Sequence, residues 1–144
     1  MIGRADIITL IPHSGAMCLL DRVSVWDGQS IQCVATSHRN SDNPLAIDGS
    51  LGAACGVEYA AQAMAIHGGL IGVLSERPKL GYLTSIRALS IYRLRLDDLE
   101  GDLVIDAYQL AADRTRVAYG FALLSEGAKV LEGRATVLLD AGKA

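Results

Sequence analysis

The sequence predicts a single α+β domain in which one long helix is wrapped by a curved antiparallel sheet. Three observations predict this fold class. Residues 53–67 are rich in alanine and apolar nearly throughout, which is the composition of a buried helix. Segments with strand-like alternation lie before and after this stretch. Short turns containing glycine and aspartate separate those segments, as in an antiparallel sheet.

Length and composition limit the class of protein. The 144 residues fit one domain, covering 1–144, and the chain is 51% apolar but only 5% aromatic, so Ala, Val, Leu and Ile must build the core. The net charge of −3 argues against nucleic acid as the main partner. Three widely spaced cysteines predict neither a disulfide framework nor a zinc site, and we expect no metal and no cofactor. No leader or long apolar run opens the chain, so we expect a cytoplasmic protein without a membrane span.

The first third of the chain predicts a short helix and a hairpin. Residues 6–11 form a brief apolar segment of one or two helical turns, which Pro12 stops. Residues 23–26 and 31–36 are strand-like, and Asp27-Gly28 marks the tight turn between them. A long polar loop, residues 38–52, follows, and loops of this length inside a compact domain are usually functional.

The central helix is expected over residues 53–67, with Gly68-Gly69 as its stop. Glu58 and Gln62 are its polar interruptions, so the helix should be buried on every side. His67 then becomes a residue at the helix C-terminus, where it interacts with the helix dipole.

The remainder of the chain predicts about four strands in an antiparallel meander. They cover residues 80–96, 103–108, 117–123 and 130–139, with turns at 113–115 and 126–127. The order is therefore strand, strand, buried helix and about four strands. A strongly curved sheet wraps such a helix, and a second protomer covers what remains open. This is the hotdog fold, and its usual unit is a dimer.

Three motifs resemble the beta-hydroxyacyl-acyl carrier protein dehydratases. Residues 11–13, Ile-Pro-His, followed by Leu-Leu-Asp-Arg-Val at 19–23, are similar to the opening motif of that family. Residues 58–63, Glu-Tyr-Ala-Ala-Gln-Ala, resemble its helix motif, and residues 81–98 resemble one of its strands. The chain also resembles a narrower group of predicted dehydratases, some from aryl-polyene pigment pathways. The resemblance implies a hotdog dimer that acts on 3-hydroxyacyl thioesters of acyl carrier protein in fatty-acid or polyene synthesis.

The chain departs from the family pattern at one place. The dehydratases carry a catalytic histidine in a loop shortly before the helix. When the chain is aligned on Glu58, that position falls at about Asn43-Pro44, and the surrounding residues 41–45 contain no histidine. This departure leaves the base of the reaction unidentified.

Dehydration of a 3-hydroxyacyl thioester needs a base near the alpha carbon and an acid near the hydroxyl group. Glu58 suits the acid role, because burial favours the protonated form of a carboxyl group. His13 and His38 are the candidate bases, and Asn43 is a candidate hydrogen-bond donor to a thioester oxygen. Each has a structural alternative: Glu58 as a carboxylate bonded to loop amides, His13 as a cap of local backbone and His38 as a strand-end residue.

The start of the helix offers a second element of a site. Free amides from Ala53 to Gly56, with Ala53 and Ala54 first, would polarise the thioester carbonyl. A hotdog thioesterase needs only such an amide, a carboxylate and polar orienting groups, and Glu58 with Gln62 one turn later satisfies it. The missing loop histidine therefore also favours an acyl thioesterase. A third possibility is a catalytically weak subunit that completes the site of a related hotdog chain in a heterodimer.

Basic residues suggest how the protein binds the carrier of its substrate. Arg87, Arg93 and Arg95 share one strand parity, and Arg77 and Lys79 lie just upstream. Such a stripe either steers acidic acyl carrier protein to the site or protects an edge strand from pairing. Acyl carrier protein and coenzyme A both remain open as carriers, since both are anionic.

Overall fold

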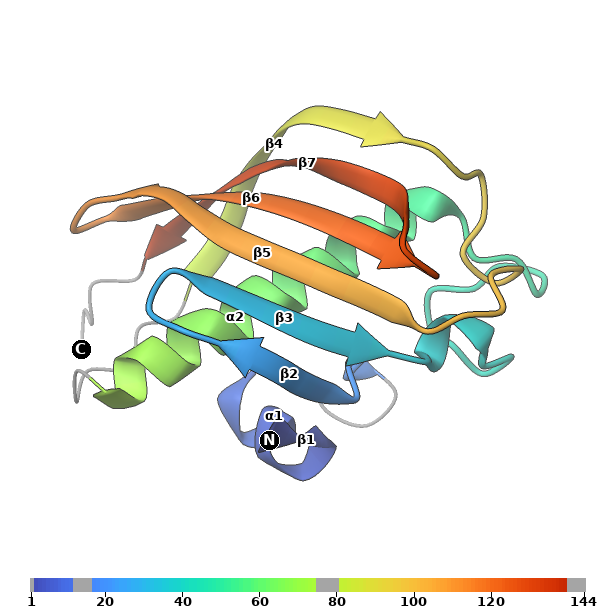
Figure 1. Ribbon diagram of the computed structural model, residues 1–144, viewed down its shortest axis with the longest axis horizontal. Coiled ribbons are helices and arrows are strands. Elements are labelled where there is room, and N and C mark those ends of the chain that lie inside the picture. Colours follow the sequence, from blue (N-terminus) through green and yellow to red (C-terminus); the bar gives the residue numbers. More distant parts are fainter. Residues whose placement is uncertain (1, 12–16, 75–80, 140–144) are drawn as a thin grey trace.

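The computed structural model describes residues 2–11, 17–74 and 81–139. A curved antiparallel sheet of seven strands surrounds one long helix, as the sequence predicts (Figure 1). The elements are, in chain order, β1 (Ile2–Gly3), α1 (Arg4–Leu10), β2 (Arg22–Trp26), β3 (Ser30–Ala35), η2 (Ser37–Arg39), η3 (Ala53–Cys55), α2 (Gly56–Leu74), β4 (Gly81–Ile91), β5 (Leu103–Ala112), β6 (Arg116–Ser125) and β7 (Ala128–Leu139).

The strand order is β1-β2-β3-β5-β6-β7-β4. The β2–β3 hairpin and the turns that flank β6 confirm the expected local pairs. The predicted meander is wrong for β4, which pairs with β7 and leaves β5 to pair with β3. The reason is that α2 crosses the concave face of the sheet, and β4, the next described strand, lies at the edge far from β3 (Figure 1). Consequently β4 is an edge strand.

The helix does not stop at Gly68-Gly69, which corrects the expected boundary and removes His67 from a helix end. Both glycines keep ordinary helical backbone, because the described glycines with positive φ are Gly49 and Gly127. Gly69 instead allows α1 to approach: a Cβ atom there would lie 3.3 Å from the Leu10 carbonyl oxygen and 3.4 Å from its Cδ2 atom. Gly69 is therefore required for the close packing of α1 against α2 and does not end the helix.

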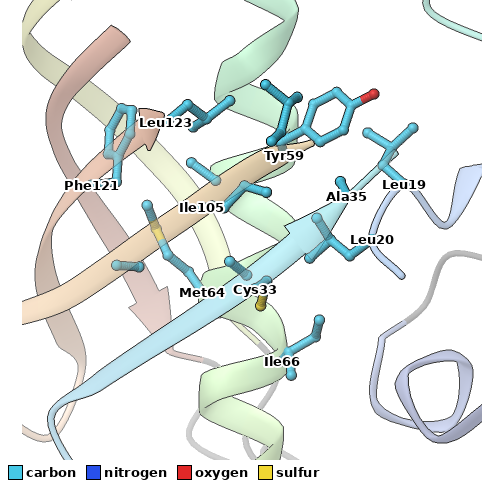
Figure 2. Packing of buried hydrophobic residues seen from close by; sticks show 14 of the residues in the cluster. Leu19, Leu20, Cys33, Ala35, Tyr59, Met64, Ile66, Ile105, Phe121 and Leu123 are labelled. Carbon is cyan, nitrogen blue, oxygen red and sulfur yellow. The ribbon is translucent and has the colours of Figure 1, made fainter. Parts of the chain in front are cut away.

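The core lies between α2 and the concave face of the sheet, and aliphatic side chains dominate it (Figure 2). Alternate residues of β5 and β6 point into this layer, among them Ile105, Phe121 and Leu123. On the side of α2 nearest β2, Leu19 and Leu20 are fully buried although they precede the strand. The segment before β2 is therefore part of the core, and this placement determines the geometry of the site.

Candidate functional site

Glu58 and Gln62 lie one turn apart on the same face of α2. Glu58 is in the first turn and half-buried, whereas Gln62 is completely buried. The Gln62 Nε2 atom lies 3.5 Å from Glu58 Oε1, at the outer limit of a hydrogen bond. The spacing of i and i+4 on a helix brings the two side chains together, as the sequence predicts.

The amide of Gln62 is mainly bound to backbone. Its Nε2 donates to the Met17 carbonyl oxygen at 2.7 Å, and its Oε1 accepts from the Leu19 N–H at 2.9 Å. The sequence suggested Gln62 as a substrate-binding residue. The structure places its polar atoms against the segment that leads into β2.

Asn43 belongs to a buried network centred on Tyr59. The Ser37 hydroxyl donates to the Leu19 carbonyl at 2.7 Å, so its 2.8 Å bond with Tyr59 must be donated by the tyrosine hydroxyl. The Tyr59 oxygen in turn accepts from Asn43 Nδ2 at 3.0 Å. Asn43 also donates to the Ser37 carbonyl and accepts from the Leu45 N–H, both at 2.9 Å.

This network bears on the role expected of Asn43 in substrate binding. Asn43 occupies the position that aligns with the loop histidine of the dehydratases. It is buried, and its side-chain amide is fully bonded to other groups of the protein. The expected hydrogen bond from Asn43 to a thioester oxygen would require that network to break. Beyond a polar group on an apolar helix, no sequence pattern indicates that Tyr59 and Ser37 are the partners of Asn43.

His38 is bonded through its ring to backbone of the β4–β5 connection. Its ring is 1% exposed, and its Nε2 lies 3.2 Å and 2.9 Å from the carbonyl oxygens of Leu99 and Gly101. Two carbonyl partners require Nε2 to carry the proton, and Nδ1 is buried without a hydrogen-bond partner. Burial lowers the pKa of His38. Through these contacts His38 joins η2 to the β4–β5 connection, and its role as a base stays a prediction.

The amides at the start of the helix are only partly available. The N–H of Ala53 donates to the Leu94 carbonyl at 3.0 Å, and that of Cys55 donates to Gly52 at 3.0 Å. Ala53 is buried, whereas Ala54 is exposed. The expectation of a free amide is therefore wrong for Ala53, because the loop after β4 uses it to hold the helix start. His13, the other candidate base, lies outside the described residues.

The predicted basic stripe does not form. β4 ends at Ile91, so Arg93 and Arg95 lie beyond the strand, and register shifts within β4 break the shared parity with Arg87. Arg95 pairs with Asp97, and this partner lowers the pKa of the Asp97 carboxyl to about 2. Arg93 lies at a small pocket with three carboxylate residues, Asp98, Glu100 and Glu126. Arg77 and Lys79 lie outside the described residues. Of the two explanations, the edge position of β4 is the one that the topology supports.

A second buried polar cluster lies in the middle of α2. His67 Nε2 donates to the Asp27 carbonyl at 2.8 Å, which leaves Nδ1 to accept from the Tyr119 hydroxyl at 2.7 Å. The two rings meet edge to face, with centroids 5.7 Å apart. Burial lowers the pKa of His67. The cluster ties α2 to β6 and to the turn of the β2–β3 hairpin.

These buried histidines predict that stability falls in mild acid. The unfolded chain takes up protons near the ordinary histidine pKa of 6.5, whereas burial holds the pKa values of His38 and His67 lower in the folded chain. The unfolded state then binds more protons, so the free energy of unfolding should fall below about pH 6.5, by up to about 1.4 kcal/mol per pH unit for each histidine. Urea unfolding between pH 8 and pH 5 measures this dependence.

The control for the pH series is His67→Gln. This variant should be less stable at pH 8 and should show a shallower decline with acid. Hydrogen bonds from backbone N–H groups lower the pKa values of the Asp27 and Asp113 carboxyl groups below the ordinary value of 3.8, so these two groups contribute little in this window. A flat profile from pH 8 to pH 5 would contradict the assignment of neutral buried histidines.

The described residues contain neither a metal-binding group of side chains nor a membrane-spanning helix. In that part of the chain, no group of three or more His, Cys, Asp or Glu side chains is placed to hold a metal ion. No helix within the same residues is long and apolar enough to cross a bilayer.

Several solved structures share the fold of the chain. The chain is similar to the dehydratase heterocomplex ApeI:P from Xenorhabdus doucetiae, with a TM-score of 0.80 and 22% identity over 92% of this chain and 89% of that chain. A mutant thioesterase from Pseudomonas aeruginosa matches with a TM-score of 0.61 and 16% identity, over 82% and 79% of the two chains. A hypothetical thioesterase with coenzyme A from Streptococcus pneumoniae has a TM-score of 0.61 and 12% identity, over 82% and 84%.

These structures establish the hotdog fold. No curated protein matches the sequence. The family comparison goes further, because the model of the ApeP-like family, described as ApeP dehydratase, matches residues 5–141. That match spans nearly the whole chain, including the half-buried Glu58 at the start of α2, and the protein therefore belongs to the ApeP-like dehydratase family.

Proposed function

We propose that the protein dehydrates 3-hydroxyacyl thioesters carried by acyl carrier protein, with Glu58 as the general acid or base. In this reaction a base removes the proton from the alpha carbon, the alpha–beta double bond forms, and the beta hydroxyl leaves as water after it is protonated. The products are an enoyl thioester and water. The observation that carries the proposal is the position of Glu58, a half-buried carboxyl in the first turn of the central helix.

His13 is the base that we propose. His38 is bonded to the β4–β5 connection, and Asn43 cannot accept a proton. Met17 is held beside Gln62, one turn from Glu58. His13 precedes Met17 by four residues, and four residues of chain span at most about 14 Å. That reach allows His13 to act on a substrate bound at Glu58.

We further propose that a second hotdog chain, identical or related, covers the site. The edge strand β4 leaves one row of backbone groups without a partner in the sheet. Large apolar side chains of β4 and of the following loop are exposed, namely Leu83, Leu89, Ile91 and Leu94. Leu94 is 89% exposed, and its carbonyl accepts the Ala53 N–H at the start of the helix. A partner that buries Leu94 would therefore also close the surroundings of the site.

Thioester hydrolysis is the second candidate, favoured by the absence of a histidine at Asn43 and by the thioesterase structures of similar fold. The commitment of Gln62 to the backbone of Met17 and Leu19 weighs against it, because the thioesterase site was expected to use Gln62 as an orienting group. Dehydration leaves the thioester intact, whereas hydrolysis releases a thiol.

One experiment separates the candidates. The purified chain is incubated with 3-hydroxyacyl acyl carrier protein and with the matching coenzyme A thioester, across several acyl lengths. Dehydration predicts a mass loss of one water from the acyl group, about 18 Da, without free thiol. Thiol release without loss of water supports the thioesterase instead. Activity that appears only after a related hotdog chain is added indicates the partner-subunit alternative, and no turnover under either condition refutes the proposed function.

A further inference from the structure

Residues 17–19 are held in place by side chains although they are not part of a strand. β2 begins at Arg22, and the first backbone bond that joins this segment to the sheet is from Asp21 N–H to the Val34 carbonyl, at 2.9 Å. Before that point, Gln62 binds the Met17 carbonyl and the Leu19 N–H. The Leu19 carbonyl is bound separately by the Ser37 hydroxyl. Both polar groups of Leu19 are thus fixed from two directions.

The hydrogen bond from the Ser37 hydroxyl to the Leu19 carbonyl is itself oriented by a further residue. Because the Ser37 hydroxyl has one proton and gives it to Leu19, the serine oxygen must accept from Tyr59. Tyr59 is fully buried, and its oxygen is bonded to Asn43 as well. Figure 2 shows the Tyr59 ring extending from α2 on the side where Leu19 packs. Gln62 therefore holds the Leu19 N–H directly, and Tyr59, on the same helix, orients the Ser37 hydroxyl that holds the Leu19 carbonyl.

The nitrogen of the Gln62 amide links this segment to Glu58. Nε2 lies 2.7 Å from the Met17 oxygen and 3.5 Å from Glu58 Oε1. We propose that Gln62 is a positioning residue, which sets the distance between Glu58 and the backbone of residues 17–19 without contacting substrate. This inference rests on the proposed function of Glu58. It goes beyond that function because it gives Gln62 a role in the geometry of the site and not in substrate binding.

The proposal predicts a specific kinetic signature. Gln62→Met keeps the length of the side chain but removes both polar atoms. We expect kcat to fall about 10-fold to 100-fold, because a displacement near 1 Å at a reacting group can cost that much, while KM stays within about threefold. Tyr59→Phe removes the hydroxyl that donates to Ser37 and accepts from Asn43, and it leaves both backbone contacts of Gln62 in place, so its kcat should fall less. Gln109→Met is the matched control, since within the described residues the side-chain amide of Gln109 bonds to Tyr119 alone, at 3.5 Å, on the neighbouring strand β6.

The test measures kcat, KM and hydrogen exchange of the Leu19 amide for these variants and for the wild type. Unchanged kcat in a folded Gln62→Met variant overturns the proposal, and so does a rise in KM with constant kcat, which indicates substrate contact. If Gln62→Met does not fold, Tyr59→Phe decides, and wild-type kcat in that variant overturns the proposal. A wild type without turnover refutes the proposed function instead. Hydrogen exchange then tests only whether Gln62 holds residues 17–19 in place. Faster exchange of the Leu19 amide in Gln62→Met supports the proposal, and unchanged exchange overturns it.

Discussion

Glu58→Gln is expected to lower dehydration by about 10²-fold to 10⁴-fold, which is the usual contribution of a positioned acid or base. The amide has nearly the shape of the carboxyl group but neither gives nor takes a proton at working pH. Packing should change little, because Glu58 is only half-buried. Turnover of a 3-hydroxyacyl carrier protein substrate, followed by mass, measures the loss, and thermal unfolding checks that the variant is folded.

Glu100→Gln is the control for the change in charge. Glu100 is exposed in the β4–β5 connection and is remote from α2 in the chain, so its substitution should leave turnover within about twofold of wild type. A Glu58→Gln variant that keeps more than a tenth of the wild-type rate would remove the carboxyl from the chemistry. In that case Glu58 would be the structural carboxylate that the sequence offered as an alternative.

The local sequence pattern predicted the order of the main helix and strands along the chain. It did not predict that β4 pairs with β7. The alternation in residues 117–123 and 130–139 predicted β6 and β7, and the glycine turn at Glu126-Gly127 predicted their pairing. Nothing in the residues of β4 shows that it pairs with β7, because that contact depends on the path of the chain across α2. Local pattern also failed at Gly69, where the cause is contact with Leu10, far away in sequence.

The sequence indicates which residues form the candidate site, but it does not indicate their partners. A carboxylate and an amide at i and i+4 on an apolar helix identified Glu58 and Gln62, since such residues are costly to bury without partners. What each partner is depends on segments brought together by the fold: residues 17–19 for Gln62 and the β4–β5 connection for His38. The sequence predicted binding or catalysis for Gln62, Asn43 and His38, and the structure shows the bonds of each to other parts of the protein, which no local pattern indicates.

The second large effect is expected in stability. Phe121→Ala should lower the free energy of unfolding by about 3–5 kcal/mol, the usual range for a buried phenylalanine. Phe121 is the only phenylalanine of the chain and is 1% exposed, within the layer between β6 and α2 (Figure 2). Urea unfolding at pH 8, where the buried histidines are neutral, measures the change. Leu110→Ala is the control, because Leu110 is 52% exposed.

We expect the cost at Phe121 to lie in the upper half of that range because its neighbours cannot fill the space. In the sheet Phe121 is paired with Ala107 on β5 and with Gly133 on β7. The ring lies close over Gly133, where a Cβ atom would be 3.0 Å from the Phe121 Cζ atom. Neither neighbour has a side chain long enough to move into the void, and an unfilled cavity adds to the loss of apolar contact. A cost near that of Leu110→Ala would mean that the ring does not fill the core, and the aliphatic packing between α2 and β6 would then have to hold the sheet curved by itself.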